Sequence, residues 1–114
     1  MHEILHHLAP GSLVLDLGCS AGSFNAPSFP FVTVRVDLDP PTGKASVPLV
    51  QADAARLPFR PRAFDAVICN HSLEHFENLK PALQEIGCVL KSDGALFISV
   101  PDATNILITS MCPL

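Results

Sequence analysis

The stretch that decides the fold runs from Leu13 to Phe24 and reads Leu-Val-Leu-Asp-Leu-Gly-Cys-Ser-Ala-Gly-Ser-Phe. An apolar run breaks here into a turn of small residues directly after an acid. Such a junction lets the backbone approach a ligand closely at the carboxyl end of a parallel strand, where open α/β sheets bind their ligands. The stretch predicts a strand and a turn for a nucleotide-type cofactor. A plain strand-to-helix turn is the alternative.

The spacing of the small residues separates two kinds of cofactor turn. A dinucleotide fingerprint, G-x-G-x-x-G, counted from Gly18 needs glycine at positions 20 and 23, and serine stands at both. The pattern Asp16-x-Gly18-x-Ser20-x-Gly22 instead resembles the first motif of the class I S-adenosylmethionine (SAM) dependent methyltransferases, acid-x-G-x-G-x-G, with serine at the middle glycine. The resemblance implies that Gly18, Cys19, Ser20 and Gly22 surround the methionine part of SAM. It also implies that Asp16 orients the SAM amino group through this loop.

An acid also follows the second predicted strand. Val32–Val36 is rich in β-branched residues, which predicts a short buried strand ending at Asp37. A carboxylate at this position can accept both hydroxyl protons of a ribose. We therefore expect Asp37, with its neighbour Leu38, to bind the cofactor. The alternative is that Asp37 and Asp39 are two solvated turn residues.

A third strand is predicted at Val47–Ala52, followed by Asp53 and Ala54. In the methyltransferases that the chain resembles, an aspartate at this place accepts a hydrogen bond from the adenine amino group, and a small residue lies by the ring. The resemblance implies these roles for Asp53 and Ala54. The run Leu57-Pro58-Phe59 is similar to one common in the small-molecule methyltransferases. Taken alone, Asp53 would be an ordinary loop acid.

The fourth predicted strand, Phe64–Cys69, runs into Asn-His-Ser-Leu-Glu-His-Phe at positions 70–76. This segment resembles the "FD-x-V … LEH" segment of the same family, in the "methyltransferase type 11" group. Residues just after this strand face the methionine end of SAM in the family. The resemblance therefore implies that Asn70 and His71 lie in the cofactor pocket.

Two histidines after this strand raise the questions of a metal and of a general base. His71 and His75 are four residues apart, but the metalloprotease pattern needs glutamate directly after the first histidine, where Ser72 stands. We expect no metal. A histidine titrates near neutral pH and can act as a general base, so His71 is the candidate catalytic residue. A helix-start or pocket-wall role is the alternative, and the catalytic residues are otherwise unknown.

Helix and strand alternate once more. Asn78 can cap a helix whose first turn tolerates Pro81, the turn Lys91–Gly94 ends that helix, and Ala95–Val100 predicts a fifth strand. The alternation predicts an α/β fold with a Rossmann-like, doubly wound, mostly parallel sheet. The predicted apolar stripe of the helix comprises Leu79, Leu83, Ile86 and Leu90.

Three departures from the family pattern stand out. Only nine residues separate Gly22 from Val32, and the segment between Asp39 and Val47 is rich in poor helix formers, so the first two family helices are expected to be shortened or replaced by loops. The chain after Pro101 is too short for another helix and two strands. We therefore expect an incomplete, truncated core whose fifth strand is an exposed apolar edge, through which a homodimer would form.

Composition indicates one partial domain over residues 1–114. The chain is 48% apolar and 16% charged, with a net charge of −4. No apolar run approaches the roughly 20 residues that cross a bilayer, and the scattered basic residues form no footprint for nucleic acid. We expect a soluble, cytoplasmic protein without a membrane partner. Nucleic acid is a disfavoured substrate, and an RNA methyltransferase with a separate binding domain is the alternative that stays open. The four cysteines, none in a C-x-x-C pair, are predicted to be buried or semi-buried thiols: Cys19, Cys69, Cys88 and Cys112.

The resemblance implies a SAM-dependent transfer of a methyl group to a small-molecule acceptor. Direct displacement at the sulfonium methyl needs alignment more than it needs an acid or a base. Two other functions stay open: a SAM-binding module without activity, and a domain for another adenosine cofactor such as NAD or ATP.

Overall fold

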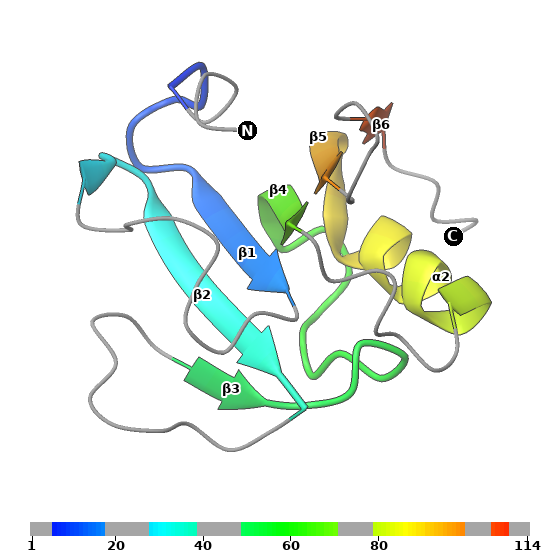
Figure 1. Ribbon diagram of the computed structural model, residues 1–114. Coiled ribbons are helices and arrows are strands. Elements are labelled where there is room, and N and C mark those ends of the chain that lie inside the picture. The colour runs from blue at the N-terminus through cyan, green and yellow to red at the C-terminus, as the bar shows by residue number, and fades with distance from the viewer. Residues whose placement is uncertain (1–5, 18–27, 39–48, 71–78, 100–105, 110–114) are drawn as a thin grey trace.

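The computed structural model describes residues 6–17, 28–38, 49–70, 79–99 and 106–109 (Figure 1). Within these ranges the chain forms one helix and six strands. They are β1 (Leu13–Leu17), β2 (Val32–Asp37), β3 (Leu49–Gln51), β4 (Phe64–Asn70), α2 (Leu79–Val89), β5 (Leu90–Ser99) and β6 (Ile106–Thr109).

The strands form a single sheet in the order β3-β2-β1-β4-β5-β6. The first five strands run parallel and β6 runs antiparallel to β5. The order reverses beside β1, because the chain moves outward to β3 and then returns to pair β4 with the other side of β1. This topology confirms the Rossmann-like, mostly parallel sheet, and it creates the switch point at which such sheets bind ligands.

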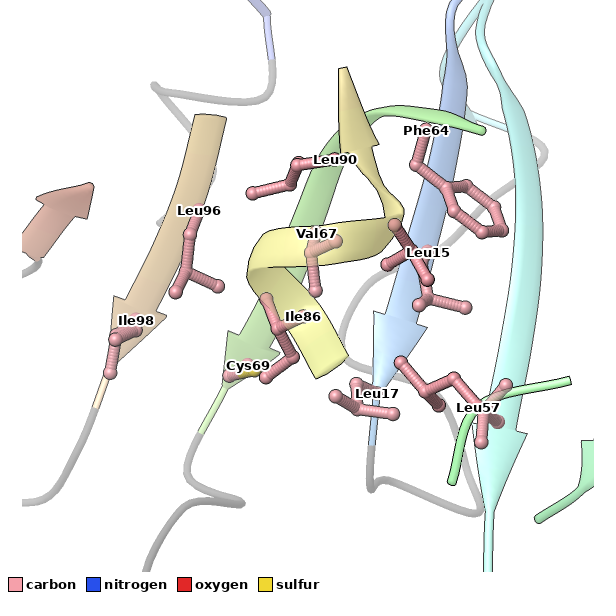
Figure 2. Close-up of a cluster of buried hydrophobic side chains, with 12 residues drawn as sticks. Leu15, Leu17, Leu57, Phe64, Val67, Cys69, Ile86, Leu90, Leu96 and Ile98 are labelled. Carbon is pink, nitrogen blue, oxygen red and sulfur yellow. The ribbon is translucent and has the colours of Figure 1, made fainter. Parts of the chain in front are cut away.

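The main core lies between the sheet and α2. Parallel strands are covered on both faces and therefore read as nearly continuous apolar runs, as in Leu-Val-Leu of β1. Figure 2 shows Ile86 of α2 above side chains of β1 and β4. The buried members of this cluster are Leu15, Leu17, Val36, Leu57, Phe64, Val67, Cys69, Ile86, Val89, Leu90, Leu96 and Ile98.

A smaller cluster occupies the opposite face of the sheet. It joins Phe31 to alternate residues of the central strands, with Leu8 and Phe29 packed against it. The rings of Phe29 and Phe31 stack with their centroids 5.1 Å apart. Residues that precede β1 and β2 thus cover this face where the strands begin. The buried strand residues of this cluster are Val14, Ala66, Ile68 and Phe97.

The helix differs from the predicted stripe at both ends. Leu79 is 44% exposed, and Leu90 is buried as the first residue of β5, opposite Phe64. The stripe fails there because α2 ends at Val89. Pro81 lies in the first turn, as predicted, where its missing N–H has no helical partner to lose. The buried residues of the helix are Ala82, Ile86, Gly87 and Val89.

The predicted turn at Lys91–Gly94 is an irregularity inside β5. Phe64 is level with Leu90, yet Ala66, only two residues later, is level with Ala95. The extra residues of β5 therefore bulge away from the ladder, as an inserted residue does in a β-bulge. The regular strand pairing is therefore interrupted at the predicted turn, but β5 continues through this segment.

The prediction of an exposed β5 edge is wrong. β6 pairs antiparallel with β5, with Ile106, Leu107 and Ile108 opposite successive β5 residues from Ile98 backward. The prediction assumed that covering β5 requires another helix and two strands, as in the family. An antiparallel neighbour needs only a short connection. The homodimer proposed through an uncovered β5 edge loses its structural basis.

Two of the four cysteines lie in the described part of the chain. Cys69 is buried and Cys88 is half-buried, as predicted, while Cys19 and Cys112 lie outside the described residues. The expected loss of the first two family helices concerns positions 18–27 and 39–48, which also lie outside. Among the described helices, none is long and apolar enough to span a membrane.

Candidate cofactor site

The carboxyl ends of the parallel strands gather at one edge of the sheet, where the arrowheads of β1 and β2 point in Figure 1. The register makes these ends level, because Leu17 pairs with Val36 and Asp37 pairs with Gln51. All six predicted site residues within the described ranges lie near, at or just beyond this edge. They are Asp16, Asp37, Leu38, Asp53, Ala54 and Asn70. The rest fall outside the described ranges: Gly18, Cys19, Ser20, Gly22 and His71.

Asp16 is fully buried inside the sheet. Its carboxylate Oδ2 lies 3.3 Å from Nε of Arg35, which is itself 7% exposed. The two residues are direct partners in the β1–β2 ladder. A carboxylate that is buried and paired in this way is not accessible to a ligand by direct contact.

The tip of β2 is tied to the end of β3 by two hydrogen bonds. The N–H of Ala52 donates to the carbonyl of Asp37 at 2.9 Å, and Nε2 of Gln51 donates to the carbonyl of Leu38 at 3.1 Å. Asp37 is half-buried, while the side chain of Leu38 is 64% exposed. An acid and an accessible apolar side chain are thus held side by side at the sheet edge.

The loop after β3 folds around Asp53. The carboxylate Oδ1 accepts the N–H of Ala55 at 2.9 Å, and the carbonyl accepts the N–H of Arg56 at 2.9 Å, which is an Asx-type turn. A carboxylate has about four acceptor sites, so the turn leaves Asp53 able to accept a donor from a ligand. Further along, Leu57 enters the core and its N–H donates to Oε1 of Glu85 on α2 at 2.9 Å.

Three residues that organise this edge were missed in the sequence. Arg35 had a signal, because it is the one charge inside the β-branched run Val-Thr-Val-Arg-Val, and a buried charge needs a partner. No feature of the sequence distinguished Gln51 or Glu85, since polar residues at a strand end and on a helix are common. Their roles depend on which segments the fold brings together.

The question of a metal site is answered only for part of the chain. No group of three histidine, cysteine, aspartate or glutamate residues within the described ranges is arranged to hold a metal ion. His71 and His75 stand outside these ranges, so the expectation for them stays a prediction.

The chain matches a known protein family over most of its length. The profile described as "Methyltransferase domain" matches residues 15–98. This range begins in β1 and ends in β5. It therefore contains all four strand ends that form the candidate site.

Individual proteins show the same likeness. The chain is 35% identical to an uncharacterised protein of Methanocaldococcus jannaschii, over 83% of this chain and 43% of the relative. It is 31% identical to the probable tRNA methyltransferase 9B of Mus musculus, over 88% of this chain and 24% of the relative. The crystal structure of the YcgJ protein of Bacillus subtilis superposes with a TM-score of 0.70 and 25% identity, covering 86% of this chain and 50% of that one. The chain thus spans less than half the length of these two curated relatives.

Proposed function

Because the chain belongs to the class I SAM-dependent methyltransferases, we propose that it binds SAM at the carboxyl edge of its sheet and transfers the methyl group to a small-molecule acceptor. One observation carries the proposal. The described strands β1, β2 and β3 bring Asp16, Asp37 and Asp53 to or near the carboxyl edge of a parallel sheet with a switch point beside β1, in the order of the family motifs.

The adenosine half of SAM would be held by the ends of β2 and β3. Asp37 is the acceptor for the ribose hydroxyls, Leu38 offers an accessible apolar side chain beside it, and Asp53 with Ala54 frames the adenine. The hydrogen bonds from Ala52 and Gln51 support this assignment, because they hold the β2 tip and the β3 loop together.

The methionine half would be held by residues that follow β1 and β4. Gly18, Cys19, Ser20 and Gly22 form the turn around it, Asp16 steadies that turn from within the sheet, and Asn70 and His71 complete the pocket. SAM supplies a methyl group on a sulfonium, which is reactive without an activating acid. The work left to the chain is to align donor and acceptor, and His71 is the candidate base for an acceptor that must lose a proton.

Charge favours a small molecule over nucleic acid as acceptor. The net charge is −4 and the chain holds only seven lysine and arginine residues, whereas nucleic-acid binding rests on neutralising phosphates with many clustered lysine and arginine side chains. An RNA acceptor, suggested by the name of the murine relative, is the rival that an assay with bulk tRNA tests. The free thiols of buried Cys69 and half-buried Cys88 suit a reducing compartment, and we propose that the protein is cytoplasmic.

Calorimetric titration of the chain with S-adenosylhomocysteine tests the cofactor site, with NAD as the control ligand. We expect S-adenosylhomocysteine to bind with a micromolar Kd and NAD not to bind. Asp37→Asn should weaken binding by about tenfold or more, since it removes charge-assisted hydrogen bonds. The same substitution at Asp93, an exposed residue in the β5 bulge, is the matched control and should change nothing.

Two outcomes would overturn the proposal. Tight binding of NAD would assign the site to another adenosine cofactor, and unchanged affinity in Asp37→Asn would remove the ribose role. Methyl transfer from labelled SAM to a panel of small molecules then separates an enzyme from a binding module. Binding without turnover across the panel and with bulk tRNA favours the module.

A further inference from the structure

A buried ion pair links the two strands whose tips carry the glycine turn and the ribose acid. Nε of Arg35 lies 3.3 Å from Oδ2 of Asp16, and the exposed fractions of the two side chains are 8% and 0%. Asp16 stands two positions before Gly18, and Arg35 stands two positions before Asp37. The pair therefore lies directly beneath both binding elements of the proposed site.

Stability alone does not account for this pair. Removing two charges from water is costly, and well-packed apolar residues in their place often serve a fold as well or better. The neighbouring strand residues are apolar: Asp16 is level with Ile68 on β4, and Val14 lies on the same face. The backbone ladder between β1 and β2 continues from Leu13 to Leu17 without help from either side chain.

We infer that Arg35 is a positioning residue for SAM: by holding the Asp16 carboxylate, it fixes the turn after β1 relative to Asp37. The inference rests on the proposed function. The β2 tip is already tied to β3 through the hydrogen bond from Ala52 to Asp37. The Arg35–Asp16 pair adds a side-chain link to the backbone ladder between β1 and β2 just below their tips. The segments proposed to bind methionine, ribose and adenine are thereby held at fixed distances from one another.

Three variants of the chain separate positioning from mere stability. Arg35→Met removes the charge partner, Arg35→Lys keeps a cation, and the double variant Asp16→Asn with Arg35→Met removes both charges. Arg60→Met, at an exposed position in the loop between β3 and β4, is the matched control. Two quantities are measured for each: the thermal unfolding midpoint and the Kd for S-adenosylhomocysteine.

We expect Arg35→Met to lower the unfolding midpoint and to raise the Kd by about tenfold. The double variant should recover the midpoint, because no uncompensated charge stays buried, yet keep the raised Kd. Arg35→Lys should bind more tightly than Arg35→Met, and Arg60→Met should match the parent chain in both quantities.

A Kd restored together with the midpoint in the double variant would overturn the inference, since the pair would then serve the fold alone. An unchanged Kd in folded Arg35→Met would also overturn it. If Arg35→Met does not fold, the double variant decides by the same criterion. Failure of the parent chain to bind S-adenosylhomocysteine is a separate outcome, which overturns the proposed function and this inference with it.

Discussion

Oε1 of Glu85 accepts a hydrogen bond from the backbone N–H of Leu57, with 2.9 Å between the two atoms. Glu85 lies on α2 and Leu57 lies in the loop after β3, so the bond joins the helix to the segment that carries Asp53 and Ala54. The side chain of Leu57 is also part of the main core. The loop after β3 is thus anchored twice at its far end.

Glu85→Ala should destabilise the chain by about 1 kcal/mol or somewhat more, because it leaves a partly buried N–H without its acceptor. It should also weaken binding of S-adenosylhomocysteine by loosening the loop. Glu85→Gln keeps an acceptor oxygen and should lose less. Urea unfolding measures the stability, with exposed Gln84→Ala on the same helix as control. Equal stability of Glu85→Ala and Gln84→Ala would contradict the anchoring role.

Asp65 makes stability depend on acid pH. Its Oδ2 accepts the N–H of Leu13 at 2.8 Å and its Oδ1 lies 3.0 Å from Nζ of Lys91. The hydrogen bond from Leu13, and then the bond and charge of Lys91, lower the pKa of Asp65 below its usual 3.8, against the opposing effect of burial. A lowered pKa contributes stability that is present above the usual value and is lost as pH falls through the folded value.

The free energy of unfolding of the parent chain and of Asp65→Asn should therefore differ at pH 6 and converge as the pH falls below about 4. The difference should be modest, roughly 1 kcal/mol or less, because both side chains of the ion pair are partly exposed. Urea titrations at several pH values measure it, with Asp93→Asn as control. A difference that stays constant down to pH 3 would exclude Asp65 as its source.

The central strands could be predicted because their sequences have the β-branched and apolar composition of buried strands. The predicted strand at 32–36 is observed at Val32–Asp37, and the one at 64–69 is observed at Phe64–Asn70. The first is a short β-branched run and the second a short, mostly apolar run, and both are bounded by turn residues, which is the pattern of a strand. The acid at the tip of β2 could be placed for the same reason.

What the sequence could not supply depends on contacts between distant segments. Asp16 and Arg35 each fall within a predicted strand, but only the register makes them partners. β6 was missed because the four-residue run Ile-Leu-Ile-Thr at Ile106–Thr109 does not by itself distinguish a strand from a helix, and it becomes a strand by pairing with β5. Leu79 fits the helical stripe in spacing, yet the start of α2 leaves it exposed.

Gly94→Ala should destabilise the chain by about 1–3 kcal/mol, as overpacking does. A Cβ at this position would lie 3.0 Å from the carbonyl oxygen of Lys91 and 3.1 Å from that of Asp65, and backbone atoms cannot move aside cheaply. The bulge in β5 thus requires glycine where the strand returns to register. Thermal unfolding measures the effect, with exposed Ser92→Ala in the same bulge as control. A Gly94→Ala midpoint equal to that of Ser92→Ala would show that the bulge has room.

Ile86→Ala and Leu79→Ala test which face of α2 holds the helix on the sheet. Ile86 is fully buried, and Figure 2 shows it among Val67, Cys69 and Leu15. Its truncation should cost about 2–5 kcal/mol, whereas truncation of Leu79, which is 44% exposed, should cost well under 1 kcal/mol. Chemical unfolding of both variants measures the difference. Equal losses would mean that the predicted stripe, and not the observed face, packs on the sheet. Since small domains have a total free energy of unfolding of only about 5–15 kcal/mol, the loss at Ile86 alone should remove a large share of the stability of the fold that holds the carboxyl edge together.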